Sequence, residues 1–426
     1  MVPNGWEEVN LGEVIKHQKG YAFKSGSYKK HGVRIIRISD TTRNSIHDKS
    51  PVYLDNKEAQ ALSNFQLKSE DIILSTVGSR PHLLDSMVGK AVQVPAKDNG
   101  ALLNQNLVKI IPKNQLITNN YLFSMLTKSR FIYFISTLVR GNANQVSITL
   151  AELFAYKFLL PTYKEQQKIA TILGTWDKAI STTERLIDNS KQQKKSLMQQ
   201  LLTGKKRLLD DSGKPFDAEW EDKYLHDVAR IIVSPVDKKT IEGEIPVELC
   251  NYTDVYYNTR ITKSLTFMKA TAKQSEIDKY TLKVNDVIVT KDSETPGDIA
   301  VPALISEDLN GVVCGYHLAI IRPNNELVEG SFLNYLFSMP KTRYYFFTLA
   351  TGATRFGLSV GGINKAHFTL PPLVEQQKIA TLLTNTDKEI ELFTQQLADL
   401  KQEKKALMQQ LLTGKLRVKI DNKEVA

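Results

Sequence analysis

Several short loops of the sequence combine basic and amide side chains with tyrosine, glycine or histidine. In the first half of the chain these residues are Lys19, Tyr21, Lys24, Arg80, Asn104, Asn106, Arg140, Asn142, Asn144 and Gln145. In the second half they are Tyr252, Lys291, Tyr316, His317, Thr354 and Arg355. Lysine and arginine pair with phosphate, arginine can donate two hydrogen bonds to guanine, and asparagine or glutamine can form two with adenine. The loops are therefore candidates for nucleic-acid contact, although many polar loop residues are simply hydrated.

Motifs for catalysis are absent from the sequence. The only Pro-Pro pair, Pro371-Pro372, lies between two leucines and lacks the polar and aromatic neighbours with which an adenine methyltransferase holds a flipped base. The sequence has no glycine-containing S-adenosylmethionine loop, no phosphate-binding loop and no His-Glu-x-x-His zinc motif. His82, His317 and His367 could each act as an acid or base, but isolated histidines are more often ordinary surface or core residues. We expect no catalytic site and no metal site.

The composition indicates a globular protein with an excess of positive charge. The 426 residues are 42% hydrophobic and 24% charged, and the net charge of +10 favours a polyanionic partner. This excess lies in the first half: the net charge is +8 for 1–163, +6 for 164–208 and −5 for 209–373. No apolar run approaches the roughly 20 residues that span a membrane, and the two cysteines are too few for a disulfide framework. We expect a cytoplasmic protein without a membrane segment.

An internal repeat organises the chain. Residues 165–173 recur at 375–383, and residues 194–205 recur at 404–415, in both cases 210 positions later. The regions before these segments match more loosely, with Trp6 corresponding to Trp220 and Gly141 to Gly352. Near-identity beside divergence indicates one part with a fixed structural role and another part that is free to vary. The predicted order is domain, helix, domain, helix.

Each repeated helix carries an apolar stripe at alternating spacings of four and three residues, which is typical of a coiled coil. The stripe comprises Ile169, Leu173, Trp176, Ile180, Ile187, Leu197 and Leu201 in the first helix, and Ile379, Leu383, Ile390, Phe393, Leu397, Leu407 and Leu411 in the second. Lys194 and Lys404 occupy equivalent positions of the stripe, so a parallel pair in register would bring like charges together in its core. We therefore expect antiparallel packing, which also relates the two domains by an approximate two-fold axis. The alternative is that each helix docks only on its own domain.

The domains themselves are predicted to be strand-rich. Runs rich in β-branched residues predict strands at 33–38, 71–77, 107–111, 286–290 and 318–321, and the segments 119–137 and 331–349 are predicted to be helical. The fold class is therefore mixed α/β (α+β), with two tandem domains and two long helices. The predicted boundaries are 1–160 and 209–370 for the domains, 161–208 and 371–418 for the helices, and 419–426 for a tail.

The repeated motifs resemble a known family. The runs at 141–148, 160–161 and 165–170, repeated at 352–359, 370–371 and 375–380, resemble the HsdS-type specificity subunits of type I restriction-modification systems. The resemblance covers nearly the whole chain in both copies, including residues 20–24. One departure is that Arg355 stands in a loop whose first copy is rich in asparagine and glutamine.

The resemblance implies two target recognition domains, each reading one half of a bipartite, asymmetric sequence in double-stranded DNA, with helices that set the gap between the halves. It also implies two modification subunits that dock on the helices and domains, bind S-adenosylmethionine and methylate adenine at N6. Restriction subunits would add translocation and cleavage that depend on ATP and magnesium. This chain would then be a non-catalytic subunit that binds none of these cofactors.

Two other classes of function remain open. A coiled-coil scaffold that assembles proteins without reading DNA is favoured by the net acidic 209–373 region. It would show no salt-sensitive DNA affinity, whereas DNA binding weakens steeply as salt rises. A self-sufficient nuclease or methyltransferase would show activity from the purified chain alone.

Overall fold

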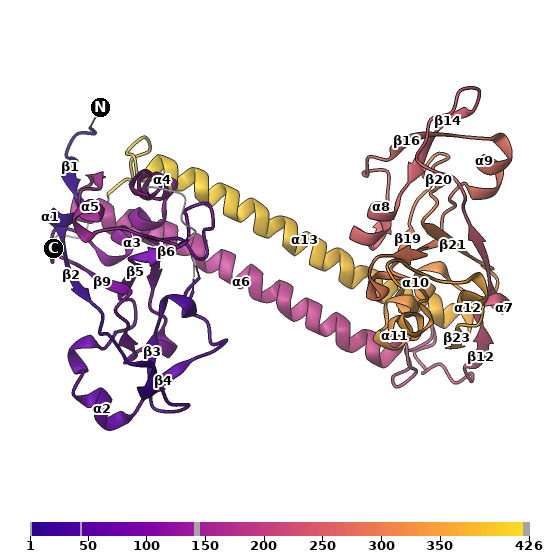
Figure 1. Cartoon of the computed structure of the whole chain (residues 1–426), viewed down its shortest axis with the longest axis horizontal. Helices are drawn as coiled ribbons and strands as arrows, with labels where there is room; N and C mark the ends of the chain where they lie inside the picture. Colours follow the sequence, from indigo (N-terminus) through magenta and orange to yellow (C-terminus); the bar gives the residue numbers. More distant parts are fainter. Residues whose placement is uncertain (1, 43–44, 140–144, 421–426) are drawn as a thin grey trace. The chain divides into compact units, whose positions relative to one another are not determined.

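The computed structural model describes residues 2–42, 45–139 and 145–420. These residues form two compact units, the first drawn from 1–184 and 395–426 and the second from 185–394. Each unit holds a mixed α/β domain together with parts of two long helices (Figure 1). The predicted fold class is therefore confirmed.

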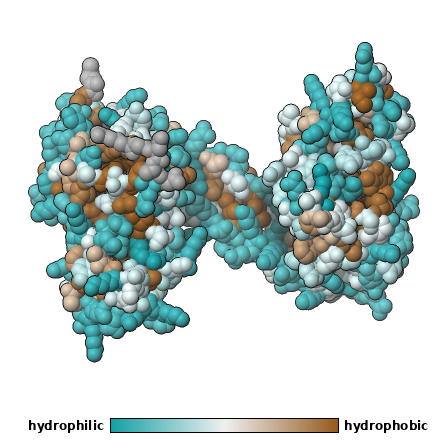
Figure 2. All heavy atoms as spheres, viewed as in Figure 1, coloured by the Kyte–Doolittle hydropathy of each residue, from teal (hydrophilic) through white to brown (hydrophobic). Residues whose placement is uncertain are grey.

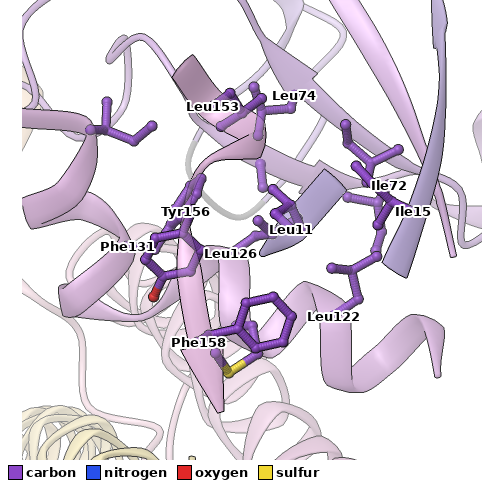
Figure 3. Packing of buried hydrophobic residues seen from close by; sticks show 14 of the residues in the cluster. Leu11, Ile15, Ile72, Leu74, Leu122, Leu126, Phe131, Leu153, Tyr156 and Phe158 are labelled. Atoms are coloured by element: carbon purple, nitrogen blue, oxygen red, sulfur yellow. The ribbon is translucent and has the colours of Figure 1, made fainter. Parts of the chain in front are cut away.

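A four-stranded antiparallel sheet lies at the centre of the first unit. Its order is β2 (Ile15–Lys19), β9 (Leu107–Pro112), β5 (Ile72–Ser75) and β7 (Ala91–Gln93). β5 is buried on both faces, because successive side chains of a strand point to opposite sides and each side meets a separate apolar core. The first core lies under the helices α3 (Asn119–Thr127) and α4 (Ser129–Leu138). Figure 3 shows its residues, among them Leu11, Ile15, Ile72, Leu74, Leu122, Leu126, Phe131, Leu153, Tyr156 and Phe158.

Smaller sheets complete the first unit. β4 (Val52–Leu54), β3 (Val33–Ile36) and β8 (Leu102–Leu103) form a three-stranded sheet beside α2 (Asn56–Gln60). Two ribbons pair distant segments: β1 (Glu7–Asn10) with β11 (Lys157–Leu160), and β6 (Val77–Gly78) with β10 (Val146–Ser147). The short helices α1 (Leu11–Val14) and α5 (Leu150–Phe154) follow β1 and β10.

The second unit repeats this plan with an extra strand. Its five-stranded sheet has the order β13 (Ala229–Val233), β21 (Leu318–Pro323), β17 (Val287–Thr290), β19 (Pro302–Ile305) and β15 (Arg260–Ile261). A three-stranded sheet joins β16 (Met268–Ala272), β14 (Ile245–Cys250) and β20 (Val313–Cys314). The ribbons pair β12 (Glu221–Tyr224) with β23 (His367–Leu370), and β18 (Asp292–Ser293) with β22 (Phe356–Gly357). The helices are α7 (Leu225–Val228), α8 (Tyr252–Tyr257), α9 (Gln274–Tyr280), α10 (Gly330–Ser338), α11 (Pro340–Leu349) and α12 (Val360–Asn364).

The two segments predicted to be helical, 119–137 and 331–349, are helical, and each is divided into two helices. Lys128 (φ −76°, ψ 156°) separates α3 from α4, and Met339 (φ −68°, ψ 139°) separates α10 from α11. One extended residue redirects the chain, so that both short helices bury apolar side chains in the same core. Pro340 favours the new start in the second unit, since proline fits the first helical position but cannot donate a hydrogen bond to the preceding turn. The helical prediction is thus confirmed, whereas the breaks at Lys128 and Met339 were not predicted.

The long helices α6 (Tyr163–Leu201) and α13 (Leu373–Leu411) have 39 residues each, which corresponds to about 58 Å. In the first unit the beginning of α6 shares the core with the end of α13 through Ile169, Leu173 and Leu411. In the second unit the end of α6 shares the core with the beginning of α13 through Leu201 and Ile379. The helices therefore pack antiparallel within each unit, as predicted from Lys194 and Lys404. The apolar stripes that contain these lysines form the seam between the two helices.

The predicted seam positions follow this packing. Ile169, Leu173, Ile187, Leu201, Ile379, Leu383 and Leu411 are buried, and Trp176, Ile180, Leu197, Ile390, Phe393, Leu397 and Leu407 are half-buried. Each seam lysine faces an acid of the other helix, with Lys404 paired to Asp177 in the first unit and Lys194 paired to Asp387 in the second. The charges within the seam are thus neutralised in the folded chain.

Each unit also has an ion pair that fastens the end of one long helix to the start of the other. In the second unit Arg207, which follows α6, donates two hydrogen bonds of 2.7 Å to Glu375 in the first turn of α13. In the first unit Arg417, which follows α13, donates to Glu165 in α6, and Glu165 also accepts from the indole N–H of Trp6. The repeated sequence therefore makes the same contact twice with the two helices exchanging roles.

Candidate nucleic-acid interface

In the second unit, three separate chain segments meet beside the short ribbon of β18 and β22. β18 continues from the central strand β17, and β22 follows the loop after α11. The Lys291 N–H donates to the His317 carbonyl (2.9 Å), and the Leu358 N–H donates to the Lys291 carbonyl (3.0 Å). These backbone bonds hold the predicted candidates Lys291, His317 and Arg355 close together.

Asp292 is the centre of an ionic network in these loops. Its Oδ1 accepts a hydrogen bond from Arg355 Nε (3.0 Å) and lies 2.8 Å from Arg355 Nη2. The same oxygen is 2.7 Å from His317 Nδ1, and Lys291 Nζ is 3.5 Å from the other carboxylate oxygen. The Asp292 side chain is only 12% exposed, whereas that of Arg355 is 55% exposed. A buried carboxylate thus gathers three cationic or potentially cationic side chains at the surface.

Tyrosines line the same loops. Lys291 Nζ lies 5.5 Å from the centre of the Tyr316 ring, and Tyr316 is 48% exposed. On α8 the rings of Tyr252 and Tyr256 stack with their centres 5.5 Å apart, and the Tyr252 hydroxyl donates to Ser293 Oγ (3.2 Å). Burial raises the pKa of Tyr252, so its hydroxyl keeps its proton at neutral pH. Aromatic and cationic groups side by side can contact bases and phosphates.

The first unit has the same arrangement of backbone hydrogen bonds and paired short strands, which we call the loop frame. The Thr76 N–H donates to the Asn106 carbonyl (3.1 Å), the Ile148 N–H donates to the Thr76 carbonyl (3.1 Å), and β6 pairs with β10 as β18 does with β22. By this pairing Thr76, Val77, Asn106 and Gln145 of the first unit correspond to Lys291, Asp292, His317 and Arg355 of the second. The frame is therefore shared, while the side chains on it are uncharged in one unit and charged in the other.

Tyr21 and Asn104 join this frame in the first unit. The Gln105 N–H donates to the Tyr21 carbonyl (2.9 Å), and Tyr21 is 40% exposed. Asn104 is buried, and its Oδ1 accepts from the Asn106 N–H (3.3 Å), so its side chain holds the turn. A Cβ on Gly20 would lie 2.1 Å from the Asn104 carbonyl oxygen, so this approach of the two segments requires glycine.

The remaining candidates are placed one by one. Lys19 is exposed at the end of β2, Lys24 is exposed after Tyr21, and Arg80 is half-buried after β6. Thr354 is exposed directly before Arg355, and Gln145 is exposed directly before β10. Arg140, Asn142 and Asn144 lie outside the described residues.

Asp292, at the centre of the network, was not among the residues predicted from the sequence. A search for cations and amides passes over a carboxylate, because a carboxylate repels phosphate when it acts alone. The alignment of the two copies was the available signal, since Asp292 replaces Val77 at an otherwise equivalent position.

Two further observations concern the described parts of the chain. There, no group of three His, Cys, Asp or Glu side chains is arranged to hold a metal ion. Over the same residues, no helix combines the length and apolar character needed to cross a membrane. On the face seen in Figure 2, hydrophilic residues cover most of each unit, with hydrophobic residues showing between them.

The repeated α/β domains, the paired helices and the polar loop frames define a duplicated recognition subunit. The chain belongs to the family of the type I restriction modification DNA specificity domain, whose sequence profile matches residues 3–190 and again residues 217–402. The two matches agree with the two copies of the internal repeat.

Individual relatives agree with this assignment. The chain is 26% identical to the putative type I restriction enzyme MjaX specificity subunit of Methanocaldococcus jannaschii, over 98% of this chain and 95% of that protein. It is 24% identical to the MjaVIII specificity subunit of the same organism, over 98% and 94% of the two chains. The crystal structure of the type I restriction-modification S subunit from M. genitalium has a similar fold, with a TM-score of 0.60 and 12% identity over 97% of this chain and 98% of that chain.

Proposed function

We propose that the chain is the non-catalytic DNA-recognition subunit of a type I restriction-modification enzyme in the cytoplasm. Each unit would read one half of a bipartite, asymmetric target in double-stranded DNA. The observation that carries this proposal is the repeated loop frame, which presents uncharged side chains such as Gln145 in one unit and a charged set around Asp292 in the other. Two equivalent frames with different side chains are what the reading of two different half-sites requires.

The two long helices would fix the spacing between the half-sites and dock two modification subunits. The support is their near-identical sequence in both copies and the ion pairs that fasten each helix end, Arg207 with Glu375 and Arg417 with Glu165. The modification subunits would bring S-adenosylmethionine and the methyl transfer, and restriction subunits would bring ATP and magnesium. The chain itself would need none of these cofactors.

The first experiment is co-expression of the chain with a type I modification subunit from the same genome, followed by mapping of methylated adenines in the host DNA. We expect a bipartite motif whose halves change independently when the residues of either domain, 1–160 or 209–370, are exchanged for those of a relative. A continuous motif, or no motif, would refute the proposal.

A salt titration of DNA binding separates recognition from scaffolding. Binding to a duplex carrying the mapped motif should weaken steeply between about 50 and 200 mM salt, because each phosphate contact releases a counterion. A stable complex with the modification subunit, together with no DNA affinity, would instead indicate a scaffold. Methylation by the purified chain alone would show that it is an enzyme.

A further inference from the structure

At two of the four equivalent positions of the loop frames, the second unit has an acidic and a basic side chain where the first unit has uncharged ones. The first unit has Val77 and Gln145 where the second has Asp292 and Arg355. The arginine and the carboxylate therefore occur together, and neither has a charged counterpart at the same place in the first unit. A replacement of both partners points to a paired role for these two side chains.

The contact between Asp292 and Arg355 leaves one end of the guanidinium available. Asp292 Oδ1 lies 3.0 Å from Nε and 2.8 Å from Nη2, so it occupies the Nε edge of the group. The guanidinium carries five N–H donors in a fixed plane, and the opposite end, formed by Nη1 and Nη2, still carries donors. This end can reach two acceptors at once, as guanine O6 and N7 in the major groove require.

His317 also limits the orientations that the Arg355 guanidinium can adopt. Arg355 Nη2 is 3.0 Å from His317 Nδ1 and 3.3 Å from Nε2. Since it is nearly equidistant from two ring nitrogens whose lone pairs diverge, the guanidinium nitrogen lies over the ring face. His317 Nδ1 is itself 2.7 Å from Asp292 Oδ1, so the carboxylate orients both side chains.

Stability alone does not account for this arrangement. The Arg355 side chain is 55% exposed, and ion pairs at such exposure stabilise a fold little. Preorganising a long side chain, in contrast, lowers the entropy that must be lost when a ligand binds. The arrangement therefore favours a ligand with two adjacent acceptors.

We propose that Arg355 recognises a guanine in the half-site read by the second unit, and that Asp292 is the positioning residue that holds Arg355 for this contact. The proposal rests on the function proposed above. It specifies which base Arg355 contacts and which buried residue, Asp292, orients Arg355 for that contact. Gln145, at the equivalent place in the first unit, cannot form the same contact with guanine.

The test uses the complex of the full chain with its modification subunit and duplexes that carry the mapped motif. Each guanine of the second half-site is replaced in turn by 7-deazaguanine, which removes the N7 acceptor and keeps Watson–Crick pairing. For the unchanged chain, one such replacement should weaken binding roughly tenfold. For Arg355→Gln and Arg355→Lys the same replacement should have little further effect, since neither side chain can grip N7 and O6 together.

The positioning role is tested with Asp292→Asn and a matched control. Asp286→Asn removes another buried aspartate of the same unit, which pairs with Arg322 at 2.7 Å. Asp292→Asn should reduce the roughly tenfold effect of 7-deazaguanine, whereas Asp286→Asn should lower thermal stability and leave that effect unchanged. Circular dichroism of each variant verifies the fold.

The outcomes separate the two proposals. If no motif is mapped and no DNA is bound, the proposed function fails. If a motif is bound but no guanine distinguishes the unchanged chain from Arg355→Gln, the guanine contact is refuted. If Asp292→Asn and Asp286→Asn leave the 7-deazaguanine effect equally intact, Asp292 is only structural.

Discussion

Lys128 carries a buried amine between α3 and α4 of the first unit, and its replacement tests how this unit is stabilised. The residue is 9% exposed, and its Nζ lies 3.5 Å from the sulfur of Met125. Burial lowers the pKa of Lys128 from its ordinary 10.5 to about 7, and the positive charge of Arg130 acts in the same direction. Met339 occupies the equivalent place between α10 and α11 of the second unit. Lys128→Met therefore gives the first unit the residue that the second unit already has at this position.

The direction of the pH dependence follows from the lowered pKa. Between pH 7 and 10.5 the unfolded chain binds this proton and the folded chain does not. The stability of the first unit should thus rise with pH over this range, by up to about 1.4 kcal/mol per pH unit. Below pH 7 both states carry the charge, and the full cost of burying it, at most on the order of 5 kcal/mol, is present.

Lys128→Met should remove this pH dependence. We expect the variant to be more stable than the unchanged chain by a few kcal/mol at pH 6, and the difference to shrink towards pH 10. Urea unfolding of the full chain, followed by circular dichroism at pH 6, 8 and 10, measures both free energies. A variant that gains nothing at pH 6, or gains equally at every pH, would refute the reasoning.

Lys90→Met is the matched control. Burial also lowers the pKa of Lys90, to about 8, but its Nζ donates to the carbonyls of Thr41 and Asp85, each at 2.6 Å. Removing this lysine leaves buried acceptors without their donor and should destabilise the first unit by roughly 1–3 kcal/mol. The two substitutions should therefore act in opposite directions.

The other predictions concern the second unit. Glu375→Gln should lower its stability by about 3 kcal/mol in urea unfolding, because Glu375 is fully buried and its loss leaves the charge of Arg207 without its partner; a change under about 0.5 kcal/mol would contradict this. Leu383→Ala should cost about 3 kcal/mol in the same assay, since it opens a cavity in the core shared by the two long helices. Gly352→Ala should weaken binding to the target duplex in fluorescence anisotropy, because its Cβ would lie 1.9 Å from the Arg355 carbonyl oxygen and must displace the loop; unchanged affinity would show that this loop does not contact DNA.

Much of the architecture could be predicted because it repeats or has a period. The nearly identical segments in both copies revealed the duplication, and the alternation of three and four between apolar residues identified the buried face of each long helix. Lys194 and Lys404 even indicated the direction of packing, since like charges avoid one another in a seam. The break at Lys128 could not be predicted, because the residues on both sides of it have the same helical pattern.

The residue types of the candidate interface could be predicted from the sequence, but the contacts between these residues could not. Residue types indicated that Lys291, His317 and Arg355 suit contact with nucleic acid, yet they lie in three loops far apart in the sequence. Asp292, which connects them, is acidic and was not among the cationic, amide and aromatic side chains indicated by the sequence.

The sequence by itself determined the duplication, the mixed α/β domains and the buried face of each long helix, because these depend on local composition and period. Only the tertiary structure decided that Lys404 pairs with Asp177, that Lys194 pairs with Asp387, and that Arg355 meets Asp292. Such contacts join residues far apart along the chain. The free energy of a non-local contact depends on which surfaces pack against each other, and a local sequence pattern does not determine which distant surfaces do so.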